Sequence, residues 1–253
     1  MSKEYYSFTS YSDVEDLKRL DFIVSQVESL GKKGAKVIDI GCGNGNISLA
    51  LGSLGYDVYG VDIDANSIAN ARQKNTFKQV KFDVLDVSLL QLGEKFDVVV
   101  CSEVLEHLEQ PDKMVATIAG ILDTNGLFVA TVPNGFGPRE VLITRPMQWL
   151  TARKLDKGIT AFKKLLGYNA TTLQSSNEDL THIHFFTFSA LQKMMVNAGF
   201  AKYNYQNGDF LERIFPISLF TKRFKWLQRL DCWIIDFLPR QLSGGFYTSW
   251  RKK

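Results

Sequence analysis

Cysteine is scarce in this sequence. Only Cys42, Cys101 and Cys232 occur among 253 residues, without a CxxC pair, and such spacing favours reduced thiols over a disulfide framework. No apolar run approaches the roughly 20 residues that a membrane-spanning helix needs. The first ten residues lack the apolar core of a secretory signal. We therefore expect a soluble, cytoplasmic protein.

The sequence also has no large excess of positive or negative charge. Thirty Lys and Arg face 27 Asp and Glu, a net charge of +3, which argues against a dedicated nucleic-acid-binding protein. The distribution is uneven, because residues 1–135 carry −7 and residues 136–253 carry +10. A basic second half favours an anionic acceptor, with a solvated helical face as the alternative. Its first basic residues are Arg139, Arg145, Arg153, Lys154, Lys157, Lys163 and Lys164.

Hydrophobic periodicity predicts alternating strands and helices in the first half. Ser12 and Glu15 have the spacing of a capping box that opens the first helix, and Asn66 is a predicted helix cap. This alternation indicates βαβ units and a parallel sheet covered on both faces. The expected strands span residues 36–40, 57–62, 80–82, 96–101 and 127–132, followed by 182–186, 201–205 and 245–250.

The chain is expected to form one domain over residues 1–253. Its parts are an N-terminal helical cap, a core, a helical substrate lid, and a C-terminal part of the sheet with an amphipathic basic segment. Their expected boundaries are 1–35, 36–135, 136–180 and 181–253.

The most informative motif is the glycine-rich loop Gly41-x-Gly43-x-Gly45, between a predicted strand and a predicted helix. Glycine permits a tight turn and close approach to a ligand, and the helix N-terminus offers unpaired N–H groups. Asp62 ends the next strand, where a carboxylate can accept hydrogen bonds from both hydroxyls of a ribose. The pattern predicts a nucleoside site. A glycine-rich turn beside a solvated aspartate is the alternative.

The position of Asn46 helps to distinguish between nucleosides. A dinucleotide fingerprint requires glycine or alanine there, which disfavours a NAD-dependent dehydrogenase. The spacing G-x-G-x-G, preceded by Asp39, instead resembles motif I of class I S-adenosylmethionine-dependent methyltransferases. Further segments are similar to later motifs of that family: VYGVD at 58–62, DVLDV at 83–87, FDVVVCSEVLEHL at 96–108, GLFVATVPN at 126–134 and HIHFFTFSALQKMMVNAGF at 182–200.

This resemblance implies a Rossmann-like α/β fold with a seven-stranded, mostly parallel sheet and an antiparallel last strand. It implies S-adenosylmethionine as cofactor and S-adenosylhomocysteine as product. The loop Gly41, Cys42, Gly43, Asn44 and Gly45 is expected at the methionine moiety, and Asp39 at its ammonium, directly or through water. The remaining implied contacts are Asp62 with the ribose, Ile63 with the adenine face, Asp86 and the Val87 amide with the adenine edge, and the Cys101–Glu103 turn near the sulfonium.

Only three histidines occur, which limits the search for a general base. His107 follows Glu103 and Glu106 at offsets that share one face of a helix. Three hypotheses follow. Glu103, Glu106 and His107 form a base with its orienting acid, or they bind a divalent cation, or the segment is a structural turn that closes over the cofactor. His182 and His184 share one face of a predicted strand. His182 is expected to line the acceptor pocket, with a purely structural role as the alternative.

The acceptor is narrowed by motifs that are absent. The chain lacks the (N/D)PP(Y/F) element, a cysteine after proline and an evident paired-glutamate loop, which disfavours DNA and protein-arginine methylation. In layout it resembles methyltransferases of bacterial polysaccharide biosynthesis, with VPNGFGP, an insertion, HIHFFT and LPRQLSGGFY. We expect methyl transfer to a hydroxyl of a small molecule, namely a sugar of a surface glycan or a nucleotide sugar. The alternatives are O-methylation of a lipid or quinone phenol and a non-catalytic cofactor-binding protein.

Residues 211–242 mix aromatic and basic side chains. Three interpretations fit such amphipathic helices: a cap over a pocket, a homodimer face, or a peripheral contact with an anionic membrane.

Overall fold

Short apolar strands form the centre of the computed structural model, which describes residues 3–86, 93–138, 140–146, 149, 183–211, 214 and 217–253. Every residue of the first strand except Lys36 is buried, as expected for a strand covered on both faces. The strands are β1 (Lys36–Ile40), β2 (Asp57–Asp62), β3 (Val80–Val84), β4 (Phe96–Ser102), β5 (Leu122–Pro133), β6 (Phe200–Asn207) and β7 (Gly245–Lys252).

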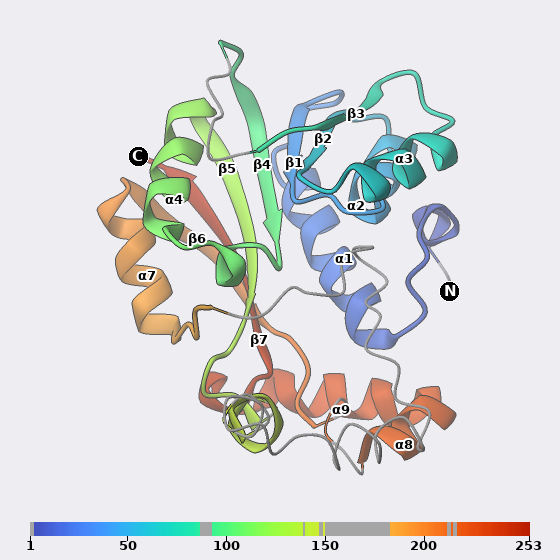
Figure 1. Ribbon diagram of the computed structural model, residues 1–253, viewed down its shortest axis with the longest axis vertical. Helices are drawn as coiled ribbons and strands as arrows, with labels where there is room; N and C mark the ends of the chain where they lie inside the picture. The colour runs from blue at the N-terminus through green and yellow to red at the C-terminus, as the bar shows by residue number, and fades with distance from the viewer. Residues whose placement is uncertain are drawn as a thin grey trace.

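These strands form one seven-stranded sheet in the order β3-β2-β1-β4-β5-β7-β6 (Figure 1). Strands β1 to β5 pair in parallel, whereas β7 lies antiparallel between β5 and β6. The predicted fold class and the antiparallel last strand are confirmed. Strand β5 begins earlier than predicted, because Leu122 pairs with Phe96 before the register shifts.

Helices cover both faces of the sheet. The α-helices are α1 (Val14–Glu28), α2 (Asn46–Ser53), α3 (Ala65–Lys74), α4 (Pro111–Ile121), α7 (Phe188–Asn197), α8 (Ile217–Arg223) and α9 (Lys225–Phe237). Side chains from α1, α2 and α3 share one apolar cluster with Val37 and Val98, while α4 and α7 share the other with Ile38 and Val99. Alternate residues of each strand thus contact opposite helical layers. Short helical segments are η1 (Glu4–Phe8), η3 (Leu105–His107), η4 (Glu140–Thr144) and η5 (Arg240–Leu242).

Two predicted helix caps are wrong. Helix α1 begins after Asp13 without a side-chain cap, and the Val14 N–H donates instead to Oε1 of Gln228 in α9, at 3.1 Å. A partner distant in the sequence replaces the local capping box. At α3 the cap is Asp64, whose carboxylate accepts hydrogen bonds from the Asn66 and Ser67 N–H groups.

The predicted strand at 182–186 is also wrong for its described part. Residues 183–186 form only an isolated bridge, in which Phe186 pairs with Asn134. Most of the predicted lid lies outside the described residues, and of the seven basic residues named above only Arg145 lies within them. That guanidinium stacks on the rings of Phe136 and Phe185, with centroid distances of 4.3 and 5.0 Å. No helix among the described residues is long and apolar enough to span a bilayer.

Candidate active site

The carboxyl ends of neighbouring parallel strands meet at one edge of the sheet. Ile40 at the end of β1 pairs with both Val61 and Cys101, and Ser102 at the end of β4 pairs with Thr131. The loops that follow β1, β2 and β4 therefore converge. Such an edge is where open α/β sheets bind ligands, and in Figure 1 the β4 arrow points toward it.

The glycine loop after β1 requires its glycines. Gly41, Gly43 and Gly45 all have positive φ angles, of 70°, 52° and 79°, a region that side chains disfavour. A Cβ atom on Gly41 would lie 2.3 Å from a methyl group of Val104. The Gly41 N–H donates to the Val61 carbonyl at 2.8 Å. The loop is thus held against β2 and against the turn after β4.

Asp62 holds this loop in place from the end of β2. Its Oδ2 atom accepts a hydrogen bond from the Gly43 N–H at 2.8 Å, and Oδ1 accepts one from the Asp64 N–H at 2.9 Å. A carboxylate offers about four lone-pair sites, so acceptor capacity remains for ribose hydroxyls. The next side chain, Ile63, is 63% exposed, leaving an apolar surface that an adenine ring could cover.

The other loop residues have structural partners. Cys42 is buried and burial raises the pKa of its thiol, which makes it unreactive. Asn44 accepts a hydrogen bond from Asn70 at 3.2 Å. Asn46 accepts one from the Ser10 N–H at 2.8 Å, which ties the N-terminal segment to the loop. Asn46, which stands where a dinucleotide fingerprint has glycine or alanine, therefore has a structural role.

Of the two residues predicted to contact the adenine edge, the structure describes only Asp86. Asp86 is exposed just beyond β3, where the preceding Leu85 N–H donates to the Asp62 carbonyl at 2.9 Å. That hydrogen bond brings the end of β3 close to the predicted ribose site. Val87 lies outside the described residues. Both contacts stay predictions.

Asp39 is a buried carboxyl group directly before the loop. Its Oδ2 atom accepts a hydrogen bond from the Ser48 hydroxyl at 2.6 Å. Burial, followed by the nearby charge of Asp62, raises the pKa of Asp39 to about 7, although the Ser48 hydrogen bond opposes the shift. The folded protein therefore favours the neutral form of Asp39 in mildly acidic solution.

This raised pKa predicts a pH-dependent stability. Between about pH 4 and pH 7 the folded state retains a proton that the unfolded state has released, so the free energy of unfolding falls as pH rises. Asp39→Asn should remove this contribution. As pH rises across that window, the free energy of unfolding of the variant should increase relative to that of the wild type by up to about 4 kcal/mol. Urea unfolding at several pH values measures this difference. Asp57→Asn, at an exposed position on β2, is the control. A difference in free energy of unfolding between Asp39→Asn and the wild type that stays constant with pH would contradict the prediction.

The turn after β4 places Glu103 in a strained conformation. Its φ angle of 57° lies in the left-handed region, which is uncommon for residues other than glycine. Thr131 stabilises this strained conformation with two hydrogen bonds, both at 3.0 Å. The Thr131 carbonyl accepts one from the Glu103 N–H, and the Thr131 hydroxyl donates the other to Oε1 of Glu103. Only Leu105–His107 form a helical turn. The expected single helix face for Glu103, Glu106 and His107 is therefore wrong.

Glu106 and His107 follow in this turn. Glu106 is fully buried, and neither of its carboxyl oxygens has a hydrogen-bond partner among the described residues. Burial, followed by the charge of Glu103, raises the pKa of Glu106 well above its ordinary value. Nε2 of His107 lies 3.7 Å from Oε1 of Glu106, and the histidine side chain is 17% exposed.

The metal hypothesis gains no support from this geometry. Within the described part of the chain, no group of three or more His, Cys, Asp or Glu side chains is placed to bind a metal ion. Ligands must be deprotonated, and the raised pKa of Glu106 opposes that. Cys101 is also fully buried, in the apolar cluster with α4. Its thiol therefore packs in the core, and only its backbone lies at the predicted cofactor edge.

Arg19 is a site residue that the sequence patterns did not identify. It lies in α1 and is buried, with Nη2 at 2.8 Å from Asp16 and Nη1 at 3.7 Å from Glu15. Nη1 also lies 3.9 Å from Oε2 of Glu103, and the guanidinium contacts the ring of buried Tyr11. Arg19 thus links α1 to the turn after β4. The signal was available, because a cation on the apolar face of an amphipathic helix needs buried partners.

The predicted acceptor histidines are only partly placed. His182 lies outside the described residues, so its role stays a prediction. The backbone N–H groups of Ile183 and His184 both donate to the Glu106 carbonyl, at 2.9 and 3.0 Å. The His184 ring lies 3.4 Å from the Glu109 carbonyl. These contacts bring the segment before α7 onto the turn that carries His107.

Comparison with known proteins identifies the family. A protein-family model described as "Methyltransferase domain" matches residues 16–205, which is more than half of the chain. The chain belongs to this methyltransferase family. The predictions of a class I methyltransferase and of an enzyme are confirmed at the level of family and fold.

The methyltransferase has curated relatives with O-methyltransferase names. It is 31% identical over 157 residues to the ubiquinone biosynthesis O-methyltransferase of Glaesserella parasuis serovar 5, covering 59% of this chain and 66% of that protein. It is 29% identical over 182 residues to the enzyme of the same name from Hahella chejuensis, covering 69% and 74%. The chain therefore spans about two thirds to three quarters of the length of these relatives.

A solved structure supports the fold. Magnesium protoporphyrin IX methyltransferase from Synechocystis, which has bound S-adenosylhomocysteine, is 20% identical with a TM-score of 0.56, and the alignment covers 95% of this chain and 84% of that one. At this identity the similarity concerns the fold alone. The expected glycan acceptor gains no support from the relatives, whose names favour the quinone alternative.

Proposed function

We propose that this methyltransferase binds S-adenosylmethionine at the Gly41–Gly45 loop and methylates a phenolic hydroxyl of a quinone-type lipid. The observation that carries the cofactor assignment is the contact between Asp62 and the Gly43 N–H at 2.8 Å. It places a carboxylate beside a glycine loop at the carboxyl edge of a parallel sheet. The names of the relatives support the acceptor class. This replaces the glycan as the preferred acceptor.

The chain's own groups fit the parts of this cofactor. Asp62 would accept hydrogen bonds from the ribose hydroxyls, and exposed Ile63 would pack on the adenine. Asp39 would attract the ammonium of the methionine moiety, directly or through water, most strongly in its ionised form. The cofactor itself supplies a methyl group activated by the adjacent sulfonium charge. The remaining tasks of the protein are to align the acceptor oxygen, exclude water and remove its proton.

His107 is the residue we assign to proton removal. It lies in the turn after β4, at the same edge of the sheet as the glycine loop, and remains partly exposed. A phenol must lose its proton to become a good nucleophile, and an imidazole is suited to accept it near neutral pH. Glu103, held by Thr131, lies at the same turn, and the Glu106 carboxyl group lies 3.7 Å from Nε2 of His107.

The His107→Ala variant tests this proposal. We expect about a hundredfold lower rate of methyl transfer to a short-chain polyprenyl catechol, because the phenol proton loses its acceptor. Affinity for S-adenosylhomocysteine should change little, since no cofactor contact is removed. Labelled S-adenosylmethionine measures the rate, and calorimetry measures the affinity. Assays with EDTA test the metal hypothesis, which full activity would reject.

The matched control is His184→Ala, because that ring contacts the Glu109 carbonyl and should leave the rate within about threefold. Unchanged transfer by His107→Ala removes the base assignment. Transfer to a nucleotide sugar but not to the catechol overturns the acceptor. Tight binding of S-adenosylhomocysteine without transfer to any acceptor favours the non-catalytic alternative.

A further inference from the structure

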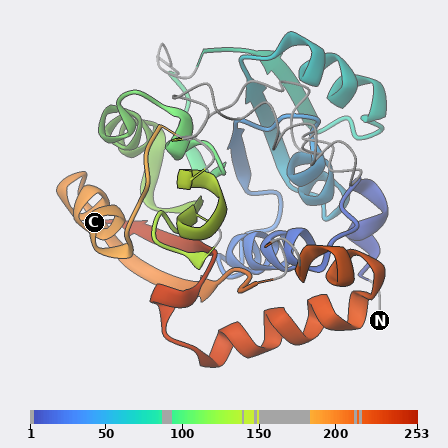
Figure 2. The same ribbon diagram turned by 60° about the horizontal axis from the view of Figure 1, so that its bottom comes forward.

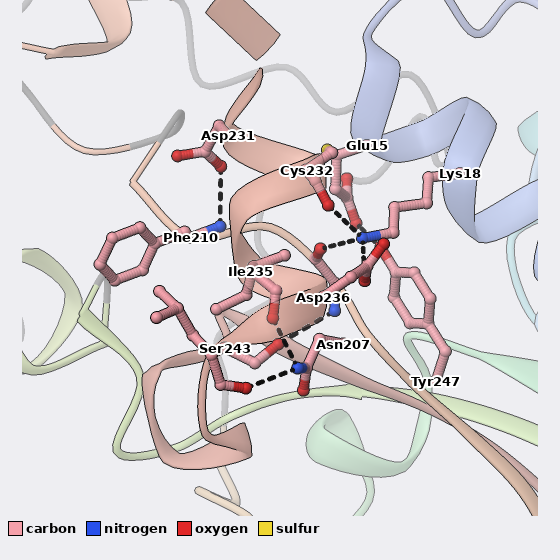
Figure 3. Close-up of polar contacts among 12 residues, drawn as sticks. Glu15, Lys18, Asn207, Phe210, Asp231, Cys232, Ile235, Asp236, Ser243 and Tyr247 are labelled. Atoms are coloured by element: carbon pink, nitrogen blue, oxygen red, sulfur yellow. Dashed lines mark hydrogen bonds and ion pairs between the residues drawn. The ribbon is translucent and has the colours of Figure 1, made fainter. Parts of the chain in front are cut away.

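Helix α9 buries Gln228, Cys232 and Ile235 against the protein, and its acidic residues are bonded to neighbouring segments. Figure 3 shows this inner face, where Lys18 of α1 reaches both the Cys232 carbonyl and the Asp236 carboxylate, at 2.8 and 2.7 Å. The Asp231 carboxylate accepts hydrogen bonds from the N–H groups of Phe210 and Leu211, at 2.8 and 2.9 Å. These contacts fix the rotation of α9 about its own axis. Its opposite face is therefore held outward rather than free to turn inward.

The outward face of α9 is apolar. Trp226, Leu230, Trp233 and Phe237 follow one another at spacings of four, three and four residues, which places them on one side of the helix. Trp226 and Trp233 are each 61% exposed and Phe237 is 73% exposed. An ordinary surface helix is apolar only on the side that faces the core, whereas α9 buries Cys232 and Ile235 on its inner side and exposes a second apolar side outward.

Helix α8 adds further exposed aromatic residues next to α9. It lies beside α9 at one end of the molecule (Figures 1 and 2). Phe220 is 63% exposed, and Phe224 between the two helices is 46% exposed. The α8–α9 surface is defined here by Phe220, Phe224, Trp226, Leu230, Trp233 and Phe237. Exposed aromatic side chains concentrated on two neighbouring helices, with the Trp233 and Phe237 rings in contact, mark an interaction site.

Basic side chains border these aromatic residues. Arg223, Lys225 and Arg229 are exposed and form no ion pair with any described residue. The two acidic residues of α9, Asp231 and Asp236, are already engaged by backbone N–H groups and by Lys18. The α8–α9 surface therefore presents unbalanced positive charge around an apolar centre.

We propose that the α8–α9 surface docks on an anionic lipid bilayer. Tryptophan and phenylalanine suit the boundary between headgroups and acyl chains, and each nearby cation adds attraction to anionic headgroups. A second copy of this chain fits less well, because a symmetric contact would bring Arg223, Lys225 and Arg229 of both copies together. The β4 arrow in Figure 1 points toward the same end of the molecule, so docking would bring the bilayer to the side of the candidate active site.

Vesicle binding by the full chain tests this proposal without an assay of methyl transfer. We expect co-sedimentation with large vesicles containing phosphatidylglycerol and far weaker binding to vesicles of phosphatidylcholine alone. Binding should weaken as salt screens the cations, and tryptophan emission should shift to the blue. The triple variant Trp226→Ala, Trp233→Ala, Phe237→Ala should bind at least about tenfold more weakly. The double variant Lys225→Glu, Arg229→Glu should lose a similar factor on anionic vesicles.

Tyr203→Ala and Val196→Ala together provide the matched control, because these side chains are 47% exposed on β6 and α7. Retained binding by this control supports the assignment to the α8–α9 surface, whereas equal loss in it overturns that assignment. No binding of the wild type to anionic vesicles overturns the lipid proposal. A dimer in sedimentation that the triple variant abolishes, without lipid binding, identifies a second copy as the occupant instead. Calorimetry with S-adenosylhomocysteine keeps the two proposals separate, because cofactor binding should be unchanged in every variant.

Discussion

Replacing Asp62 with alanine is expected to weaken the binding of S-adenosylhomocysteine by about a thousandfold. The proposed site uses this carboxylate for both ribose hydroxyls, and hydrogen bonds to a charged group contribute about 1.5 to 3 kcal/mol each. The loss of two such bonds, about 4 kcal/mol, corresponds to a factor near a thousand. The substitution also frees the Gly43 and Asp64 N–H groups, which Asp62 holds at 2.8 and 2.9 Å. The glycine loop would then lose its fixed geometry as well.

Isothermal calorimetry measures this change, and Asp83→Ala is the matched control. Asp83 is an exposed carboxylate on neighbouring β3 that pairs with Arg72 at 2.6 Å. Its loss should alter cofactor affinity by no more than about twofold. Asp62→Asn retains one acceptor oxygen and should fall between the two. An affinity within tenfold of the wild type for a folded Asp62→Ala variant would sink the proposed cofactor site.

Arg19→Met is expected to lower the free energy of unfolding by about 3 to 5 kcal/mol. Arg19 is buried among Glu15, Asp16 and Glu103, and methionine fills a similar space without the charge. Removing one partner of a buried ion pair leaves the other charges in a poorly solvated environment. That loss is a large part of the 5 to 15 kcal/mol by which typical domains are stable.

Urea unfolding followed by circular dichroism provides the measurement. Lys32→Met is the matched control, because Lys32 is exposed and pairs with Asp97 at 2.7 Å on the surface, where such pairs contribute at most about 1 kcal/mol. If Arg19→Met does not fold, Arg19→Lys retains the charge and should lose less. The prediction is wrong if Arg19→Met lowers the free energy of unfolding by less than about 1 kcal/mol, because the carboxylates around residue 19 would then not require a neighbouring cation.

The sequence allowed the sheet and the cofactor loop to be predicted because their signals are local. The apolar runs of β1 and β4 and the left-handed geometry of Gly41 and Gly43 each follow from a few adjacent residues. Asp62 was located by its distance along the chain, since a strand and a helix of ordinary length fix that spacing.

The features that were not predicted depend on contacts between distant segments. The cap of α1 is supplied by Gln228, and the partners of Arg19 include Glu103. The conformation of Glu103 depends on Thr131 in the next strand, so its departure from a helix left no trace in the residues around it. Helix α9 shows an amphipathic pattern, but the pattern alone cannot tell which face is buried. The polar contacts of Lys18 and Asp231 determine which face of α9 lies against the protein.

Strand β7 pairs on one side with β5 and on the other with β6. It also contacts the first helix, because the Tyr247 hydroxyl donates to Glu15 and the Ser249 hydroxyl donates to Gln26. Strand β7 is thus joined to α1 on one face of the sheet, while Trp250 is fully buried in the apolar cluster on the other face. During synthesis, β5 and β6 must await a strand that is made more than a hundred residues after β5. Closure of this sheet is accordingly a late and non-local step, during which the open edge of β5 is exposed to pairing with other chains.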